Sequence, residues 1–492
     1  MASQLQSTVP TEFRHVQLFI GGKLVDAASG ETFDAYNPAT NTVIAHVAKA
    51  AKEDVDRAVR AARAAFDDGP WPRMAPYQRG RIIQKVADLI RGRADELAHL
   101  ESLNSGKPLA RSKGEILGSA TVYDYYAGAG DKFFGETIPL GDTILDFTLR
   151  EPIGVCGLIV PWNFPFMMAT WKVGPALAAG CTFVLKPASN TPLTAVLLGE
   201  ICAEAGVPDG VVNVLPGPGA EIGEYLAAHP LVDKIAFTGE TATGARILKA
   251  SADTIKKVSL ELGGKSPNII FADADIERAA AAAIPAGFGN SGQVCAAKTR
   301  VFVASTVYDT FMSELIAGTE EFTVGDPFHP ATKMGPVISP TQWDRVTSYI
   351  DIGRNEGAEL VYGGGRPLGF EQGNFVQPTI FAQVSNDMRI AREEIFGPVL
   401  AVIPFSDEEE VIRAANANDY GLTGAVWTRD IGKALRVAKG VRTGSMAINS
   451  TGAAGVFTPF GGYKRSGYGR ELSMHGLELY TQVKNVYIDL SS

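Results

Sequence analysis

The sequence predicts an α/β fold with more than one structural unit, and three observations support this. From about Ile153, short apolar, β-branched runs alternate with helix-like segments, which is typical of strands buried on both faces of a parallel sheet. A second alternation of the same kind follows Cys295. The length of 492 residues suits roughly two or three domains, and 20% charged against 46% hydrophobic residues is the balance of a globular protein.

Before these alternations, the N-terminal third is expected to be mostly helical. Residues 53–69 begin with acidic residues and repeat apolar residues at helical spacing, as Val55, Val59 and Ala62 do. Residues 77–108 continue the pattern until Gly106 and Pro108 end it.

The apolar runs place the strands. In the first unit we expect strands within residues 153–161, 181–187, 210–217, 233–239, 256–264 and 266–272. In the second unit we expect them within 299–305, 323–327, 359–364, 374–382, 399–405, 424–429 and 444–450. Residues 142–152 and 481–490 alternate like edge strands, which subunit pairing often covers.

Charge and hydropathy exclude several classes of partner. The net charge is −9 and no long Lys/Arg run is present, so a nucleic-acid partner is not expected. No basic segment followed by an apolar one begins the chain, and no apolar run approaches the roughly 20 residues that a membrane span needs. We therefore expect a cytoplasmic protein that binds neither nucleic acid nor membrane.

The cysteines and histidines do not form a metal motif. The four cysteines lie far apart without a CxxC pair, and the six histidines are scattered. We expect neither a disulfide framework nor a catalytic metal.

Cys295 nevertheless has unusual neighbours. It lies in "GNSGQVCAAKTR", residues 289–300, where small residues surround the sulfur, whereas a core cysteine more often sits among branched apolar residues. The stretch is compatible with a reactive thiol or with a buried structural one.

Polar residues and glycines follow several predicted strands, where α/β sheets bind ligands. "IVPWNFP" contains Asn163, an amide donor or part of an ordinary turn, and "FVLKPAS" contains Lys186, which can hold an ADP-ribose or lie in solvent. "LPGPGAEIG" nearly matches a dinucleotide fingerprint but is one residue too long. "AFTGETATG" opens a helix whose N–H groups can receive a phosphate.

Three further segments complete the set. "LELGGKSP" ends an apolar strand with Glu261, whose neutral form burial would favour, as suits a general base; alternatively it pairs with Lys265. "EEIFGPV" and "PFGGYKRSGYGRE" are glycine-punctuated loops with aromatic residues, which are also found in ordinary turns.

In their order, these segments resemble the aldehyde dehydrogenase superfamily over almost the whole chain. The matching motifs are "PWNFP", "KPAS", "FTG....G", "LELGGKSP", "GQVC", "EEIFGPV" and "PFGGYKRSG". The likeness is greatest to the broad-specificity branch that includes betaine aldehyde-type enzymes. It implies a Rossmann-type dinucleotide-binding domain over residues 7–128 and 153–262, and a second α/β catalytic domain over 263–463. A small β extension, residues 129–152 and 478–492, would join subunits in a homotetramer or homodimer.

The resemblance also implies oxidation of an aldehyde to the acid. Cys295 matches the nucleophile, which forms a thiohemiacetal and then a thioester. Asn163 and the Cys295 N–H match the donors to the oxyanion, and Glu261 matches the base that activates water. Lys172 and Glu471 fall where the family has a proton-relay pair.

For the cofactor, NAD or NADP, the resemblance assigns Lys186 to the adenosine ribose, Gly239 to the pyrophosphate and Glu394 to the nicotinamide ribose. The expected cofactor contacts are Ile159, Val160, Pro161, Trp162, Lys186, Ser189, Gly219, Phe237, Gly239, Leu262, Gly263, Glu394 and Phe396.

Two positions depart from the family pattern. Ser189 stands where NAD-preferring relatives commonly have a glutamate, so a 2′-phosphate meets no repulsion there and NADP can serve. Glu240 replaces a common serine beside the pyrophosphate, so we expect it to point outward and omit it from the site.

The tunnel positions predict an apolar, partly aromatic channel for the aldehyde: Phe164, Met168, Trp171, Phe457 and Phe460. It suits medium aliphatic or aromatic aldehydes, and it can hold a quaternary ammonium or amino aldehyde by cation–π contact, with Tyr123 and Asp124 as helpers. A CoA-acylating enzyme is disfavoured because those relatives typically lack the glutamate. A non-catalytic binding protein on the same fold is disfavoured because Cys295, Asn163 and Glu261 are all present.

Overall fold

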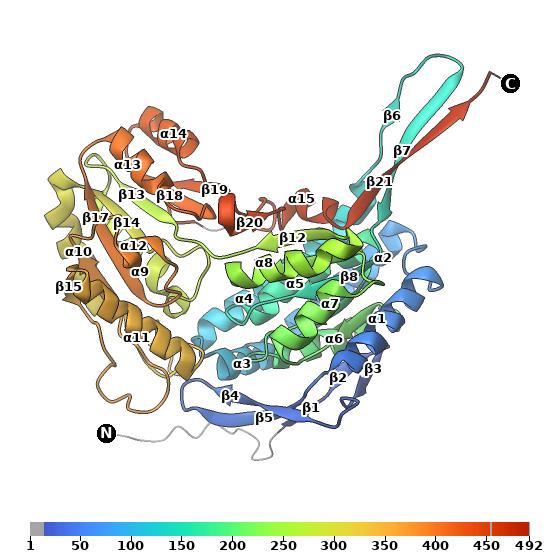
Figure 1. Ribbon diagram of the computed structural model, residues 1–492, viewed down its shortest axis with the longest axis horizontal. Coiled ribbons are helices and arrows are strands. Elements are labelled where there is room, and N and C mark those ends of the chain that lie inside the picture. The colour runs from blue at the N-terminus through green and yellow to red at the C-terminus, as the bar shows by residue number, and fades with distance from the viewer. Residues whose placement is uncertain (1–13, 453–454, 492) are drawn as a thin grey trace.

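A computed structural model describes residues 14–452 and 455–491. Residues 7–13, 453–454 and 492, which the expected domain ranges include, lie outside the described part. Figure 1 shows two α/β lobes side by side and a narrow β arm that projects from one of them.

The first lobe is built on an eight-stranded sheet. Its five central strands are parallel, and β2, β3 and β20 join antiparallel at the two edges. In spatial order the strands are β20 (Gly467–Tyr468), β12 (Lys257–Glu261), β11 (Lys234–Thr238), β8 (Val155–Ile159), β9 (Thr182–Lys186), β10 (Val212–Val214), β2 (Leu18–Ile20) and β3 (Lys23–Val25).

Helices cover both faces of this sheet because alternate strand residues point to opposite sides. Cys156 and Leu158 pack in one core with α2 (Pro76–Gly92), α4 (Leu109–Ala129), α5 (Pro165–Ala179) and α6 (Leu193–Ala205). Val155 and Ile159 pack in another with α1 (Lys52–Asp67), α7 (Glu224–Ala228) and α8 (Thr241–Ser251). The remaining helices of this part are α3 (Ala94–Ser105) and α15 (Ser473–Glu478).

The strand order reverses at β8. From β8 the chain moves outward through β9 and β10 on one side, and it returns to β11 and β12 on the other. A crevice forms beyond the carboxyl ends of the strands at such a reversal, and ligands of open α/β sheets bind there.

The second lobe has a seven-stranded sheet, parallel except for its edge strand β15. Its strands are β15 (Glu359–Tyr362), β16 (Thr379–Ala382), β17 (Val399–Phe405), β14 (Arg300–Ala304), β13 (Pro267–Ile270), β18 (Thr423–Trp427) and β19 (Ser445–Ile448). Its helices are α9 (Ile276–Phe288), α10 (Tyr308–Glu320), α11 (Pro340–Asn355), α12 (Arg389–Arg392), α13 (Glu408–Asn416) and α14 (Ile431–Gly440). The expected α/β class is confirmed.

Two of the local expectations for these parts of the chain were wrong. The start of the chain is not mostly helical, because β1–β5 lie within residues 14–48; besides β2 and β3 they are β1 (Arg14–Val16), β4 (Thr32–Asn37) and β5 (Thr42–Ala48). Residues 323–327 form only one bridge, from Val324 to Met334. The helical pattern expected over residues 77–108 is present as two helices, α2 and α3, and it stops at Gly106 as expected, where φ is +77°.

The arm consists of β21 (Thr481–Asp489), β7 (Ile144–Pro152) and β6 (Thr137–Ile138), in that order. The expectation that residues 142–152 form an edge strand was wrong, because β7 pairs with both neighbours. The outer side of β21 is the open edge. A fourth sheet, of three strands in the order β1, β5 and β4, pairs β5 parallel to β1 and antiparallel to β4. We propose the ranges expected above as domains.

Within residues 14–452 and 455–491, no helix is long and apolar enough to span a membrane. The same residues contain no cluster of His, Cys, Asp or Glu side chains that could hold a metal ion.

Candidate active site

A cavity of about 470 Å³ opens between the two lobes, at the carboxyl ends of β8, β11 and β12. Its size falls in the range of small-molecule sites. The predicted residues that line it are Pro161, Trp162, Asn163, Phe164, Met168, Trp171, Gly239, Glu261, Leu262, Gly263, Cys295, Glu394, Phe396, Phe460 and Glu471. The structure therefore brings together side chains from Pro161 to Glu471, which are far apart along the chain.

Cys295 reaches this cavity on a tightly turned loop that follows α9. Asn290 and Ser291 have φ values of +53° and +56°, and Gly292 has +70°, so the chain makes a left-handed turn just before the cysteine. A Cβ at Gly292 would lie 2.0 Å from the Gly397 carbonyl, so only glycine fits there. The Ser291 hydroxyl donates to the Gly335 carbonyl at 2.7 Å and fixes the loop.

The half-buried Cys295 thiol is protonated in the protein alone. Burial, together with the nearby carboxylates of Glu394 and Glu261, raises its pKa to about 12. The thiol therefore needs a proton acceptor or a bound positive charge before it can act as a nucleophile at neutral pH.

This shift predicts the pH dependence of alkylation in the absence of cofactor. A raised pKa keeps the thiol protonated, so the thiolate fraction should rise about tenfold per pH unit, without a plateau, from pH ~7 to ~9. Iodoacetamide modification of the free protein, followed by mass spectrometry, should show this slope at Cys295. The Cys295→Ser variant gives the background from the three fully buried cysteines. A rate that levels off below pH ~8 would contradict the expectation.

Asn163 lies in the loop between β8 and α5, and its side chain contacts the Cys295 loop. The buried amide Nδ2 donates to the Gln293 carbonyl at 2.9 Å, and Asn290 Nδ2 donates to the Asn163 carbonyl at 2.9 Å. An amide NH₂ carries two donors, so one remains for a ligand oxygen. The loop that carries Cys295 therefore holds both the side-chain amide and the backbone carbonyl of Asn163.

Glu261, the last residue of β12, has an unusual environment. It is 4% exposed, and neither carboxylate oxygen has a hydrogen-bond partner among the described residues. Burial raises its pKa well above the ordinary value, and the charge of Glu471 adds to the rise. The alternative pairing of Glu261 with Lys265 is not formed. A carboxylate with high proton affinity that faces a cavity is suited to accept a proton.

Lys172 lies behind Glu471 in the wall of the cavity. Its Nζ is fully buried, donates to the Thr238 hydroxyl at 2.6 Å and forms a short ion pair with Glu471 Oε1. The other Glu471 oxygen has no described partner. A proton acceptor beside Glu261 is therefore held in place by a buried cation.

On the opposite wall, Glu394 comes from the second lobe. Its Oε1 accepts from the Gly264 N–H at 3.0 Å, and burial raises its pKa to about 7. A Cβ at Gly263 would lie 2.1 Å from Oε2, so glycine is required for the carboxylate to lie against the backbone. Phe396, with a φ of +60°, packs edge-on against Trp162 with ring centroids 5.2 Å apart.

The adenosine-side candidates lie beyond this cavity, along β9 and the next loop. Lys186 is 3% exposed and donates to the Pro187 carbonyl at 2.7 Å. Because burial disfavours its charged form, the pKa of Lys186 is lowered to about 8. Ser189 donates to the Gly217 carbonyl at 2.8 Å, and a Cβ at Gly219 would lie 3.7 Å from Lys186 Nζ. The expected residues Ile159, Val160 and Phe237 are buried near the ends of β8 and β11.

Three expected residues lie away from the aldehyde end. Phe457 is 74% exposed and packs edge-on against Tyr125, outside the cavity. Tyr123 is completely buried in the core, and Asp124 pairs with Arg91 and Gln84 on another face of α4. The expectation that Tyr123 and Asp124 assist a cationic aldehyde is therefore wrong, because α4 turns them away from the cavity.

Several residues that line the cavity were not anticipated. Gln342 and Arg345 of α11 donate to the carbonyls of residues 394–396 and hold the Glu394 loop. Glu240 borders the cavity although we expected it to point outward. The other additional lining residues are Arg111, Glu115, Met167, Thr238, Val294 and Ala296. Thr238, Glu240 and Val294 lie within the quoted motifs, but a motif does not say which of its residues face a cavity. Arg111, Glu115, Gln342 and Arg345 lie outside every motif and reach the cavity through the packing of α4 and α11.

Comparisons with known proteins agree with this geometry. Residues 24–486 match the model of the aldehyde dehydrogenase family. The chain is 46% identical over 475 residues to the putative aldehyde dehydrogenase DhaS of Bacillus subtilis, and 47% identical over 474 residues to betaine aldehyde dehydrogenase of the same organism; each match covers 96% of both chains. The solved NAD⁺ complex of an aldehyde dehydrogenase from Bacillus cereus superposes with a TM-score of 0.95 at 46% identity, covering 97% of both chains.

Proposed function

Because the chain belongs to the aldehyde dehydrogenase family, we propose that it oxidises an aldehyde to the carboxylic acid through a covalent adduct on Cys295. The observation that carries the proposal is that Cys295, Asn163 and Glu261 line one cavity. A nucleophile, an oxyanion donor and a base are the three groups that this reaction requires.

In the first step, the Cys295 thiol gives up its proton to water in the cavity. The thiolate sulfur then adds to the aldehyde carbon, and the carbonyl oxygen becomes an oxyanion. The second N–H of the Asn163 amide and the Cys295 backbone N–H are the donors for this charge, which they bind more strongly than the neutral carbonyl. The resulting thiohemiacetal has a carbon that can lose a hydride to become a thioester. NAD or NADP, when bound, supplies the hydride acceptor.

In the second step, Glu261 takes a proton from a water molecule, which attacks the thioester and releases the acid and the Cys295 thiol. The high proton affinity that burial gives Glu261 suits this transfer. Glu471, with its free oxygen and its Lys172 partner, is the next acceptor from which the proton can leave.

The residues present fit a dinucleotide. The crevice lies at the strand-order reversal of the first sheet, where such cofactors bind. Glu394 is a carboxylate suited to ribose hydroxyls, and Gly263 leaves the space that a Cβ would fill beside it. Lys186 and Ser189 would hold the adenosine ribose, and Trp162 with Phe396 offers aromatic edges at the nicotinamide end. The NAD⁺ complex of the Bacillus cereus relative supports NAD as one cofactor.

Ser189 makes NADP a second cofactor in this proposal. A serine brings no negative charge towards a 2′-phosphate, whereas a glutamate at this position would repel it and bind the ribose hydroxyls. Glu240, at the start of α8, adds a carboxylate near the pyrophosphate position and counts against tight binding of either cofactor.

Replacing Ser189 with glutamate should shift the preference towards NAD. We expect the ratio of kcat/KM for NAD to that for NADP to rise at least about tenfold, which is about 1.4 kcal/mol. Steady-state kinetics with both cofactors measure this ratio. The Ser189→Ala variant, which adds no charge, should keep the ratio within about threefold. An unchanged ratio in Ser189→Glu would show that residue 189 does not set the preference between NAD and NADP.

The aldehyde end of the cavity favours neutral, medium-sized aliphatic or aromatic aldehydes. Its wall includes Met168, Trp171 and Phe460, and the last two rings lie edge-on with centroids 5.4 Å apart. A quaternary ammonium aldehyde remains the second candidate, because two aromatic rings can contact its cation. It is less favoured at Phe164, because Lys107 Nζ already lies 4.7 Å from the centre of that ring.

An aldehyde panel with both cofactors tests the function directly. We expect NAD(P)H formation without CoA, with higher kcat/KM for hexanal or benzaldehyde than for betaine aldehyde. Strict dependence on CoA would indicate acylation instead. No turnover with any aldehyde would favour a binding protein.

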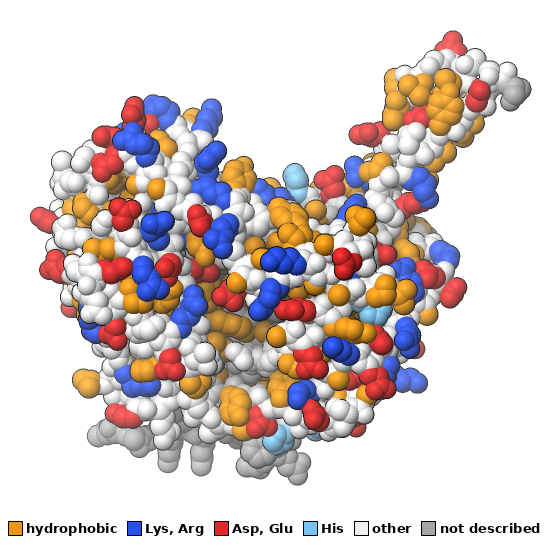
Figure 2. All heavy atoms as spheres, viewed as in Figure 1, with side chains coloured by type: hydrophobic (Ala, Val, Ile, Leu, Met, Phe, Trp, Pro, Cys, Tyr) orange, Lys and Arg blue, Asp and Glu red, His pale blue; other side chains and the backbone are white. Residues whose placement is uncertain are grey.

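We also propose that the arm joins subunits. Figure 2 shows apolar side chains gathered on the arm, and its exposed hydrophobic residues include Leu145, Val483, Tyr487 and Ile488. These side chains lie on the same arm as the unpaired edge of β21. A second copy of the chain can cover the apolar side chains and pair with this edge. Sedimentation velocity should show a dimer or tetramer, whereas a monomer at micromolar concentration would contradict the proposal.

A further inference from the structure

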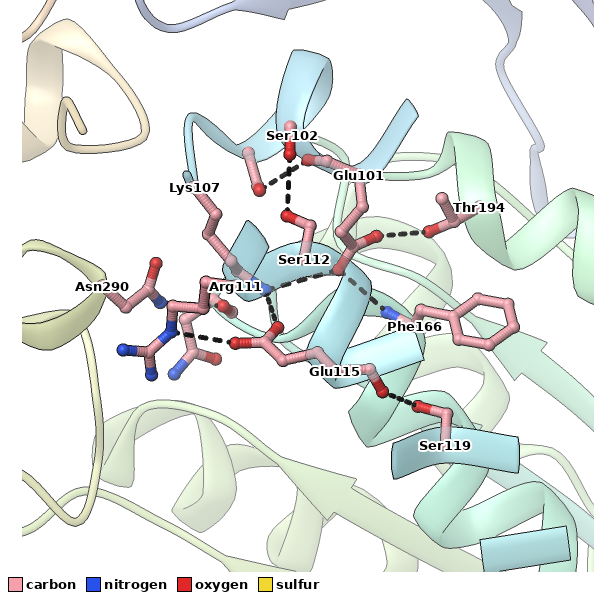
Figure 3. A network of polar contacts seen from close by, with 12 residues as sticks. Glu101, Ser102, Lys107, Arg111, Ser112, Glu115, Ser119, Phe166, Thr194 and Asn290 are labelled. Carbon is pink, nitrogen blue, oxygen red and sulfur yellow. Dashed lines mark hydrogen bonds and ion pairs between the residues drawn. The ribbon is translucent and has the colours of Figure 1, made fainter. Parts of the chain in front are cut away.

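A row of four charged side chains extends from the wall of the cavity, where Arg111 and Glu115 lie, back between α3, α4 and the start of α5 (Figure 3). Lys107 Nζ contacts Glu101 Oε1 at 3.4 Å and Glu115 Oε2 at 2.5 Å, and Arg111 Nε donates to Glu115 Oε1 at 3.1 Å. The side chains of Lys107 and Glu101 are 0% and 2% exposed. The two cations balance the two carboxylates, as buried charges require.

One end of this row holds the start of α5. Glu101 Oε1 accepts from the Phe166 N–H at 3.4 Å, and Oε2 accepts from the Thr194 hydroxyl at 2.8 Å. Phe166 is the second residue of α5, so a carboxylate lies at the end where the helix dipole favours negative charge. Asn163 is only three residues earlier, so the position of this first turn decides where its amide lies.

Lys107, in the middle of the row, contacts the same segment at Phe164. Lys107 Nζ lies over the ring of Phe164, 4.7 Å from its centroid, and Phe164 directly follows Asn163. A cation over an aromatic face is attracted to it, more strongly where water is excluded. The Asn163 carbonyl is held from the other side by Asn290 of the Cys295 loop.

We propose that Lys107, together with Glu101, is a positioning residue for the reaction: it holds the Asn163 amide against the oxyanion through Phe164 and the first turn of α5. The inference rests on the proposed role of Asn163. Buried ion pairs add little net stability compared with apolar side chains of similar size. A network of this kind is therefore better explained by the geometry that it imposes than by the stability that it adds.

Burial raises the pKa of Glu101, and the Lys107 charge opposes that rise. Without Lys107, two carboxylates would face each other in a dry environment. Glu101 would then lose its charge or move, its bond to the Phe166 N–H would weaken, and Asn163 would shift relative to Cys295.

A double-mutant cycle on the full enzyme tests this. Lys107→Met keeps the length of the side chain and removes its charge. We expect it to lower kcat at least about tenfold, with little change in the KM of a small aldehyde and in NADH binding. Asn163→Ala should lower kcat/KM about 100-fold by loss of an oxyanion donor. In the Asn163→Ala background, adding Lys107→Met should lower kcat less than about twofold, because the group that it positions is gone. Lys107→Arg, which keeps the charge, should recover most of the kcat.

Arg79 supplies the matched control. It is 6% exposed, and it donates to the Ala178 carbonyl at the other end of α5. Arg79→Met should lower the melting temperature but leave kcat within about twofold, with or without Asn163.

The outcomes separate the two hypotheses. If Lys107→Met costs the same in both backgrounds, its role is structural only and the inference is overturned. If Asn163→Ala alone leaves kcat/KM unchanged, the oxyanion role of Asn163 fails first, and this inference fails with it. If Lys107→Met does not fold, Glu101→Gln takes its place in the cycle: coupling to Asn163 supports the inference, and an additive loss overturns it.

Discussion

Replacing Cys295 with serine is expected to lower aldehyde-dependent NAD(P)H formation by at least about four orders of magnitude while leaving cofactor binding unchanged. A serine hydroxyl has nearly the same size but needs a strong adjacent base, and no histidine is among the residues that line the cavity. Initial rates from NAD(P)H absorbance measure the loss. NADH fluorescence titration should give a Kd within about twofold of that of the unchanged protein.

Cys202 is the matched control for this substitution. Burial raises its pKa to about 12, like that of Cys295, but it lies in α6, away from the cavity. Cys202→Ser should keep turnover within about twofold. The comparison shows that location, and not the pKa, distinguishes the nucleophile. More than about 1% of the original rate in Cys295→Ser would assign the chemistry to another residue.

The core of this site was predictable because strand ends are visible in the sequence. Glu261 ends β12 and Asn163 follows β8 by a few residues, and the carboxyl ends of neighbouring parallel strands meet at one edge. Cys295 was conspicuous because small residues surround it, and three of its neighbours adopt positive φ. Family resemblance then assigned roles that the residues alone left open.

What could not be predicted depends on packing between segments that are distant in sequence. Arg111 and Glu115 are on α4, and Gln342 is on α11; nothing in a helical period says which face will meet the other lobe. Three of the missed strands, β1, β2 and β3, have three residues each, too short for a clear alternation. The longer β4 and β5 mix exposed and half-buried residues and so lack the continuous apolar runs by which the other strands were found. The expected role of Asp124 was wrong because its position on α4 directs its side chain to Gln84 and not to the cavity.

Replacing Glu261 with glutamine is expected to separate the two halves of the reaction. Acylation of Cys295 should continue, but the amide cannot accept a proton from water, so thioester hydrolysis should slow by about 10²–10³-fold. Rapid mixing with an aldehyde should then give a burst of NAD(P)H close to one per active site, followed by a slow steady rate. Quenched samples should contain protein acylated at Cys295 by mass spectrometry.

The same variant should fold at least as well as the unchanged protein. Neither Glu261 oxygen has a hydrogen-bond partner among the described residues, and burial disfavours the charged form, so a neutral amide of equal size removes an unfavourable charge. Because the pKa of Glu261 is higher in the folded than in the unfolded protein, Glu261 loses its proton at a lower pH in the unfolded chain. The free energy of unfolding therefore falls as pH rises from the unfolded-state pKa to the folded-state pKa. The gain in melting temperature from Glu261→Gln should therefore be larger at pH ~8 than at pH ~4. Slow turnover without a burst would mean that Glu261 is needed before the thioester forms, and the base for water would have to be another group.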